Sequence, residues 1–265
     1  FSGEVQSERF IMKPAQLKQW FNEQFRGKTI YERLFNVLKV PSADRVRTDD
    51  LQRVAQILLK LHPGLQFLSE TPQFQTLYAQ TVALRILVEN DTNFKGFLTV
   101  RDLKKIQGQN GTEYAADPFG VHGRQGQLLE SLWQSQYESD INKNLKCFSY
   151  EHFYVFYVTF WELDQSRTKQ LTLNDLERYA NGSVCKLALE RAFSLLVKIR
   201  LRQPHLYRQI CMEKLRLHKE PSDAQVRDFL AQDAKHIFYP DFVRFLIYLE
   251  NPDLDVSVDF WFEVA

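Results

Sequence analysis

The chain has 265 residues, of which 44% are hydrophobic and 14% aromatic, so it can bury a large core in one body or in two lobes. Its 34 basic and 33 acidic side chains nearly cancel, which removes the general electrostatic argument for nucleic acid or an acidic membrane surface as a partner. The longest apolar runs are too short to span a bilayer, and three widely spaced cysteines argue against a disulfide framework. We therefore expect a soluble protein of a reducing compartment, the cytoplasm.

The N-terminal region, residues 1–62, is predicted to be helical. Apolar residues recur at helical spacing in residues 15–25 and 31–40. Thr48 and the two acids after it begin a further helix, because a capping hydroxyl and acidic side chains stabilise a helix N-terminus. The sequence His62-Pro63-Gly64 ends that helix.

Residues 63–160 are predicted to form the first of two helix-loop-helix lobes. A long helix from Pro72 leads into the loop 91–102, which has the outline of a calcium-binding EF-hand loop with glycine at its sixth position. Lys95 stands where an oxygen ligand belongs, so we expect this loop to bind calcium poorly. The stretch 107–126 holds five of the ten glycines and is predicted to be an exposed loop.

The second predicted lobe, residues 161–265, contains the stretch with the clearest chemistry. A helix with aromatic residues on one face ends near Leu163, and the loop 164–175 follows it. Oxygen-bearing side chains occupy the first, third, fifth, seventh, ninth and twelfth loop positions: Asp164, Ser166, Thr168, Gln170, Thr172 and Asp175. This spacing turns oxygens inward on a hard cation, so the candidate cofactor is calcium.

The donor set of this loop is nevertheless thin. Only Asp164 and Asp175 are anionic, Lys169 replaces the glycine of the sixth position, and Arg167 adds a second positive charge. We therefore favour the alternative that the loop is structural and has lost its calcium, while keeping its five oxygen donors other than Thr172 as the candidate metal ligands.

Four segments share a short apolar strand followed at once by a helix. They are FLTVRDLKK from Phe97, CFSYEHFYV from Cys147, QLTLNDLER from Gln170 and HIFYPDFVR from His236. Such units pair through their strands, and we expect Leu98 to pair with Phe148 and Leu171 with Ile237. The predicted fold class is therefore mainly helical, all-α, with EF-hand-like helix-loop-helix pairs, short two-stranded β-ribbons and an elongated shape.

A basic segment, residues 197–233, interrupts the second lobe. One interpretation is a docking surface for an acidic partner, and the other is an amphipathic helix with a solvated basic face. We favour the second, because the aromatic residues expected on a nucleic-acid surface are nearly absent from this segment.

No catalytic constellation is recognisable in the sequence. Asp117 and His122 are too isolated to form a two-metal phosphatase centre, and the six histidines lack ligand spacing. No serine or cysteine lies in a nucleophile-elbow pattern. We expect a protein that is not an enzyme.

Several motifs, in order, resemble the B-double-prime regulatory subunits of protein phosphatase type 2A. The stretch 148–179 carries FSYEHFYV, FWELD and LERY, and the other matching motifs are HPGLQFL at 62–68, PQFQTLYAQTVALRI at 72–86, YPDFVRFL at 239–246 and the pair Trp261-Phe262. The similarity extends from about Thr29 to Phe262 and is broken by the glycine-rich stretch and by residues 197–233.

The resemblance implies a regulatory subunit that docks on the helical-repeat (HEAT-repeat) scaffold and the catalytic subunit of the phosphatase. It implies recruitment of phosphoserine and phosphothreonine protein substrates, with calcium tuning assembly. Family members usually have Asp where this chain has Ser166 and Thr168. The stronger calcium loop of the family is expected to begin just past Ala265, where the second lobe is cut short.

Two other functions stay open at this point. A free calcium sensor would open an apolar groove on binding calcium and would change its tryptophan fluorescence. A cytoskeletal or centrosomal scaffold would act without the phosphatase, and it would place the protein at those sites or in the nucleus as well as in the cytoplasm. Co-purification with the scaffold and catalytic subunits separates the first function from both.

Overall fold

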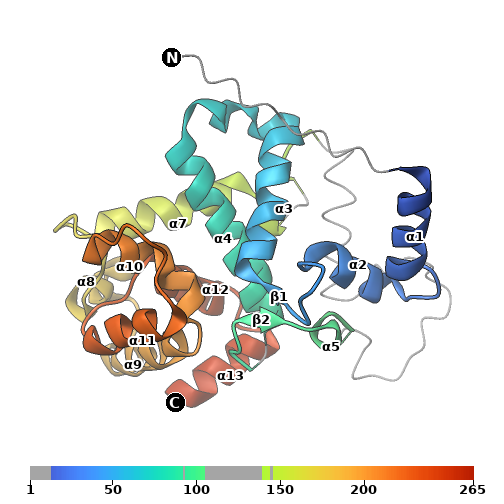
Figure 1. Ribbon diagram of the computed structural model, residues 1–265. Coiled ribbons are helices and arrows are strands. Elements are labelled where there is room, and N and C mark those ends of the chain that lie inside the picture. Colours follow the sequence, from blue (N-terminus) through green and yellow to red (C-terminus); the bar gives the residue numbers. More distant parts are fainter. Residues whose placement is uncertain (1–12, 92, 105–138, 144–145) are drawn as a thin grey trace.

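The computed structural model describes residues 13–91, 93–104, 139–143 and 146–265. Within these ranges the chain is mainly helical and has a small antiparallel ribbon, so the predicted fold class is confirmed (Figure 1). The predictions for the glycine-rich stretch 107–126, Asp117 and His122 lie outside the described residues.

The elements up to Gly182 lie on both sides of the view in Figure 1. They are α1 (Pro14–Gln24), α2 (Ile30–Leu38), β1 (Val46–Arg47), α3 (Thr48–Leu61), η1 (Pro63–Glu70), α4 (Pro72–Asn90), β2 (Phe97–Leu98), α5 (Val100–Lys104), η2 (Lys146–Phe148), α7 (Tyr150–Leu163), α8 (Leu173–Glu177) and η3 (Tyr179–Gly182). The elements that follow are α9 (Lys186–Leu201), η4 (Pro204–Tyr207), α10 (Arg208–Leu215), α11 (Asp223–Gln232), α12 (Tyr239–Glu250) and α13 (Asp255–Val264).

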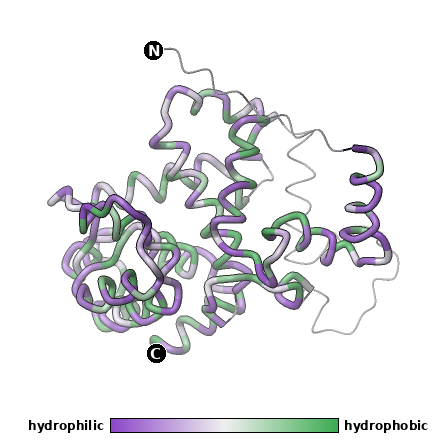
Figure 2. Tube along the Cα trace, in the orientation of Figure 1, coloured by the Kyte–Doolittle hydropathy of each residue, from purple (hydrophilic) through white to green (hydrophobic). Residues whose placement is uncertain are grey.

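Helix starts in this chain are set by local sequence. The Thr29 hydroxyl accepts the Glu32 N–H at 3.4 Å, and the Glu32 carboxylate accepts the Thr29 N–H at 2.8 Å, which is a capping box at the start of α2. Pro72 occupies the first position of α4, where a missing N–H costs nothing. Along the trace, hydrophobic and hydrophilic residues alternate in short stretches, as expected of helices with one buried face (Figure 2).

Two short strand pairings join the helix-loop-helix units. Leu171 and Ile237 exchange both backbone hydrogen bonds at 2.8 Å, so that predicted pairing is confirmed. Leu98 pairs with Val46 in the antiparallel ribbon β1–β2, so the predicted pairing of Leu98 with Phe148 is wrong. Phe148 lies at the end of η2, and its carbonyl accepts a 2.6 Å hydrogen bond from the Tyr78 hydroxyl.

The strand that pairs with Leu98 therefore comes from earlier in the chain than the strand pattern indicated. Val46 precedes a helix whose third residue is Asp50, which is the same arrangement that follows Leu98. The units at residues 46–50 and 98–102 form one pair, and those at 171–175 and 237–241 form the other. The boundaries of the three predicted regions, 1–62, 63–160 and 161–265, stay a prediction.

The core runs between α4 and α12. Both helices are buried on nearly every side from Tyr78 to Val88 and from Tyr239 to Tyr248, which is the pattern of a helix enclosed by its neighbours. α4 belongs to the first pair of units and α12 to the second, so one hydrophobic core holds the two pairs together. In the described part of the chain, none of the helices has the length and apolar character needed to cross a membrane.

Candidate functional site

The loop 164–175 is organised around the carboxylate of Asp164, which is buried at the C-terminal end of α7. Its Oδ1 accepts the backbone N–H of Thr168 at 3.0 Å and the Ser166 hydroxyl at 3.1 Å. Its Oδ2 accepts the N–H of Lys169 at 2.7 Å. Both oxygens of the first candidate ligand therefore already accept hydrogen bonds from the loop itself.

The backbone of this loop has the turn expected of an EF-hand without the glycine. Lys169, at the sixth position, has φ +62°, and Arg167 has φ +54°. Positive φ is costly for residues with a Cβ, so the hydrogen bond from the Lys169 N–H to Asp164 helps to hold this conformation.

The twelfth residue of the loop, Asp175, is already paired. Its Oδ2 accepts the N–H and the hydroxyl of Thr172 at 2.8 and 2.7 Å, and its Oδ1 accepts from Arg178 at 2.8 Å. Burial alone would raise the pKa of Asp175, but the hydrogen bonds from Thr172 and Arg178 outweigh it and lower that pKa. Arg178 also donates to the carbonyl of Leu163 at 2.8 Å and so ties the exit of the loop to its entrance.

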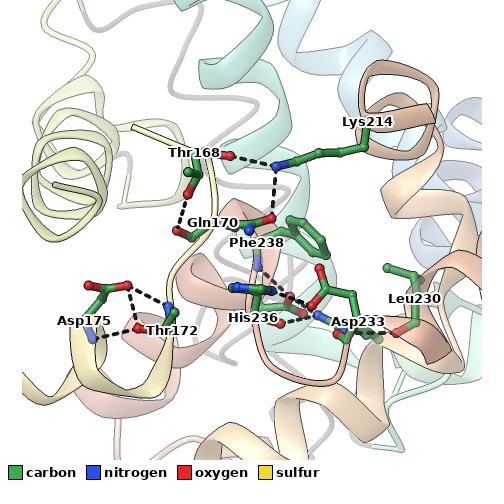
Figure 3. Close-up of polar contacts among 11 residues, drawn as sticks. Thr168, Gln170, Thr172, Asp175, Lys214, Leu230, Asp233, His236 and Phe238 are labelled. Carbon is green, nitrogen blue, oxygen red and sulfur yellow. Dashed lines mark hydrogen bonds and ion pairs between the residues drawn. The ribbon is translucent and has the colours of Figure 1, made fainter. Parts of the chain in front are cut away.

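A lysine from the basic segment reaches into the same loop (Figure 3). The Lys214 ammonium, on α10, donates to the carbonyl of Thr168 at 2.8 Å and to Gln170 Oε1 at 2.9 Å. Beside it, Lys169 pairs with Glu213 at 3.1 Å. A positive charge therefore already contacts two of the residues predicted to bind calcium.

All five predicted ligands lie in one loop: Asp164, Ser166, Thr168, Gln170 and Asp175. In the observed geometry they do not fit calcium. Calcium takes six to eight oxygens with several carboxylates among them, and both carboxylates here accept hydrogen bonds from the loop itself. Across the described ranges, no group of three or more His, Cys, Asp or Glu side chains could hold a metal ion. Calcium binding by these residues stays a prediction.

The loop 91–102 likewise contains a positively charged side chain in contact with a loop carboxylate. Asp91 Oδ2 accepts the N–H of Gly96 at 2.6 Å, and the Lys95 ammonium lies 2.7 Å from Asp102 Oδ2. Burial alone would raise the pKa of Asp102, but hydrogen bonds from Lys95 and Thr99 outweigh it and lower that pKa. Lys95, which the sequence indicated as a missing ligand, is therefore the cationic partner of the loop.

Sequence reasoning missed the role of one further basic group, Arg200. Arg200, fully buried on α9, donates to the carbonyls of His236 at 2.6 Å, Leu230 at 3.1 Å and Asp233. Its guanidinium also lies 3.7 Å from Asp241 Oδ2. The signal that could have found it is register: Arg200 follows Leu196 and Phe193 on the apolar stripe of α9.

The basic segment 197–233 uses several of its charges in contacts within the chain. Besides Arg200 and Lys214, Arg208 pairs with Asp223 at 2.8 Å and with Glu220 at 3.0 Å. These contacts support the structural interpretation of the segment over a docking surface for an acidic partner.

The comparisons with known proteins agree with this architecture. An EF-hand domain family model matches residues 30–108, a range that contains both strands of the β1–β2 ribbon. From Arabidopsis thaliana, the probable B''delta regulatory subunit of serine/threonine protein phosphatase 2A is 30% identical over 254 residues, which cover 96% of this chain and 38% of the relative. The human B'' subunit alpha is 27% identical over 226 residues, covering 85% of this chain and 16% of the relative.

A solved structure extends the match to three dimensions. A chain of a "PP2A PR70 Holoenzyme" superposes with a TM-score of 0.64 at 25% sequence identity, covering 89% of this chain and 68% of that chain. The chain is a homologue of the B'' regulatory subunits. The resemblance seen in the sequence is thus confirmed, and the B'' relatives are named regulatory, not catalytic, subunits. The chain spans about two fifths of the length of the first plant B'' relative that it matches.

Proposed function

We propose that this B'' chain is the docking core of a regulatory subunit of protein phosphatase 2A. It binds the HEAT-repeat scaffold and the catalytic subunit and brings phosphoserine and phosphothreonine proteins to the active site of the catalytic subunit. The observation that carries this proposal is the match to B'' subunits over 96% of the chain, together with the fold match to a PP2A holoenzyme chain.

In this proposal the chain contributes binding energy and no chemistry. Holding a substrate next to a catalytic centre raises its effective concentration, which can increase the rate without any catalytic group on the tether. The names of the relatives support a role that is not enzymatic. The chemistry of the described loops also supports it, because the loop carboxylates are engaged in hydrogen bonds and ion pairs.

A partly exposed aromatic cluster of Phe67, Tyr150 and Tyr154 is our candidate contact with the phosphatase. The rings of Phe67, on η1, and Tyr150 pack edge to face with their centroids 4.8 Å apart, and Tyr150 stacks with Tyr154 at a centroid distance of 6.0 Å. Phe67 is 57% exposed and Tyr154 is 48% exposed. A polar groove between α3, η1 and α4, lined in part by Gln56, Gln66 and Gln75, lies along the same η1 segment. Exposed aromatic residues beside polar groups are common at protein interfaces.

The test is competition for the phosphatase core. Purified scaffold and catalytic subunits are first saturated with the human B'' subunit alpha, and the present chain is then added in increasing amounts. Displacement of the human subunit, with the chain recovered on the core, is the expected result. Recovery of neither core subunit with the chain, in the presence or absence of competitor, would overturn the proposal.

The compartment we propose is the cytoplasm, with nuclear and centrosomal or cytoskeletal places as the further sites of such a subunit. The support is chemical: all three cysteines are free thiols, and Cys185 is exposed. Imaging of the tagged chain tests the compartment independently of the docking experiment.

A further inference from the structure

The four strand-helix units share one carboxylate position. In each, an Asp at the third position of the helix accepts the backbone N–H of the residue three before it. These bonds are Arg47 to Asp50 at 2.8 Å, Thr99 to Asp102 at 2.8 Å, Thr172 to Asp175 at 2.8 Å and Phe238 to Asp241 at 2.9 Å. In the loops 91–102 and 164–175 this Asp is the twelfth residue, the place of the bidentate calcium ligand in an EF-hand.

Each of these carboxylates also faces a basic side chain of the same chain. The pairs are Asp50 with Arg53, Asp102 with Lys95 at 2.7 Å, Asp175 with Arg178 at 2.8 Å and Asp241 with Arg200 at 3.7 Å. The first unit of each pair uses an arginine three residues further along. The second unit uses a cation that comes from its own loop or from another helix.

The Arg200 guanidinium has the surroundings of a bound cation. Three backbone carbonyls between residues 230 and 236 and the Asp241 carboxylate surround it, and it is shielded completely from solvent. A guanidinium carries five N–H donors and stays charged, so it can satisfy several oxygens at once. Oxygens of the loop that would otherwise repel one another are thereby held together.

Two cationic side chains from outside the loop 164–175 hold it together. Arg178 joins Asp175 to the carbonyl of Leu163, and Lys214 joins the carbonyl of Thr168 to Gln170 (Figure 3). Calcium in an EF-hand makes the same kind of connection, since it links the start, the middle and the end of the loop.

We propose that the basic side chains of this chain replace calcium in its helix-loop-helix units. Lys95, Arg200 and the pair Arg178–Lys214 act as built-in cations that hold the strand pairings closed without metal. This proposal concerns the described units and does not depend on docking to the phosphatase. It also gives the basic segment 197–233 a role, because that segment supplies Arg200 and Lys214.

The decisive experiment introduces a calcium ligand into one loop. Lys95→Asp places a carboxylate at the fifth position of a loop that already has Asp91, Asn93, the sixth-position Gly96 and Asp102. Lys95→Met is the matched control, since it removes the ammonium and adds no ligand. The melting temperature of the full chain is measured with a chelator, with about 1 mM calcium and with about 1 mM magnesium, beside calorimetric calcium titration.

The wild-type chain is expected to melt at one temperature in all three conditions and to give no calcium binding heat. Both variants are expected to melt at a lower temperature in chelator, and calcium is expected to restore only Lys95→Asp. Calcium stabilisation of the wild-type chain, or a Lys95→Met variant as stable as wild type, would overturn the proposal.

A double variant covers failure of the Lys95 variants to fold. Arg178→Met combined with Lys214→Met removes the two cations that bridge the loop 164–175 from outside it, and both side chains lie at the surface. Hydrogen exchange of the Leu171 and Ile237 amides is expected to speed up by at least tenfold. Unchanged protection of these two amides would count against the proposal.

Discussion

The hydroxyl of Thr81 on α4 and the phenol oxygen of Tyr239 on α12 lie 2.8 Å apart in the core. Thr81 has one hydroxyl hydrogen, and it donates this hydrogen to the carbonyl of Leu77 at 2.8 Å. Tyr239 is therefore the donor in the contact between the two helices. Because α4 and α12 belong to different pairs of units, this bond couples them.

Replacing Tyr239 by phenylalanine removes the hydroxyl and keeps the ring. We expect Tyr239→Phe to lower the free energy of unfolding by about 1 kcal/mol, the typical net value of one hydrogen bond. Chemical denaturation measures this change, and the exposed Tyr154→Phe is the matched control with no expected loss. Equal stability of both variants would show that the Tyr239 bond contributes nothing net.

The pairing of Leu98 with Val46 shows where sequence patterns stop being informative. The predicted pairing of Leu171 with Ile237 was correct, and it joins the last two of the four strand-helix segments recognised in the sequence. Val46 and Phe148 both precede a helix start, and a two-residue strand carries too little register information to choose between them. The choice is made by tertiary packing, since the Phe148 carbonyl is taken by Tyr78.

The candidate loops could be located from the sequence, but the cations inside them could not. Oxygen spacing identified residues 164–175, and Lys95 was recognised as an anomaly in its own loop. Lys214 lies 46 residues from Thr168 in sequence, and Arg200 lies 36 residues from His236. Contacts this distant are set by how α9 and α10 pack, which a single sequence does not encode locally.

Arg200 is the cation whose loss we expect to cost most. Arg200→Met leaves Asp241 buried without its nearest guanidinium and leaves three carbonyls without their donor. Breaking a buried ion pair from one side typically costs about 3–5 kcal/mol, so the variant is expected to unfold at a much lower denaturant concentration. The exposed neighbour Arg202→Met is the control, with an expected change within about 0.5 kcal/mol. A similar loss in both variants would contradict the role of Arg200.

A comparison of Gly96 with Gly27 separates the cost of backbone strain from the cost of a steric clash. It has φ +83°, and a Cβ at this position would lie 2.5 Å from Cγ of the buried Gln203, which is fixed by a hydrogen bond from Arg244. Gly27 has φ +71° and open space around it. We expect Gly27→Ala to cost about 1 kcal/mol from backbone conformation alone and Gly96→Ala to cost about 2–4 kcal/mol. Thermal unfolding compares the two, and equal losses would mean that Gln203 can move aside.

Because His205 is largely buried, we expect the folded protein to lose stability in mild acid. Burial lowers the pKa of this imidazole below its ordinary value of 6.5, although Asp49 and Asp223 oppose the shift. As the pH falls below about 6.5 the unfolded chain binds the proton first, so the folded state loses stability until the folded pKa is reached.

For this reason the free energy of unfolding is expected to fall by up to about 1.4 kcal/mol per pH unit between pH 6.5 and the folded pKa. His205→Gln is expected to flatten that part of the profile, and measurements near pH 8 provide the internal control because the imidazole is neutral in both states. An unchanged slope in the variant would assign the acid sensitivity to other groups.

Docking through the aromatic cluster is tested by removing its two exposed rings. In the competition assay, Phe67→Ser combined with Tyr154→Ser is expected to weaken displacement of the human B'' protein at least tenfold, because central aromatic contacts often contribute about 2 kcal/mol each. Leu187→Ser, on α9, removes a comparably exposed apolar side chain (54%) and is expected to leave displacement unchanged. Since all three side chains lie at the surface, melting temperatures should stay close to wild type and exclude misfolding as the cause. Equal displacement by both variants would place the contact with the phosphatase elsewhere on the chain.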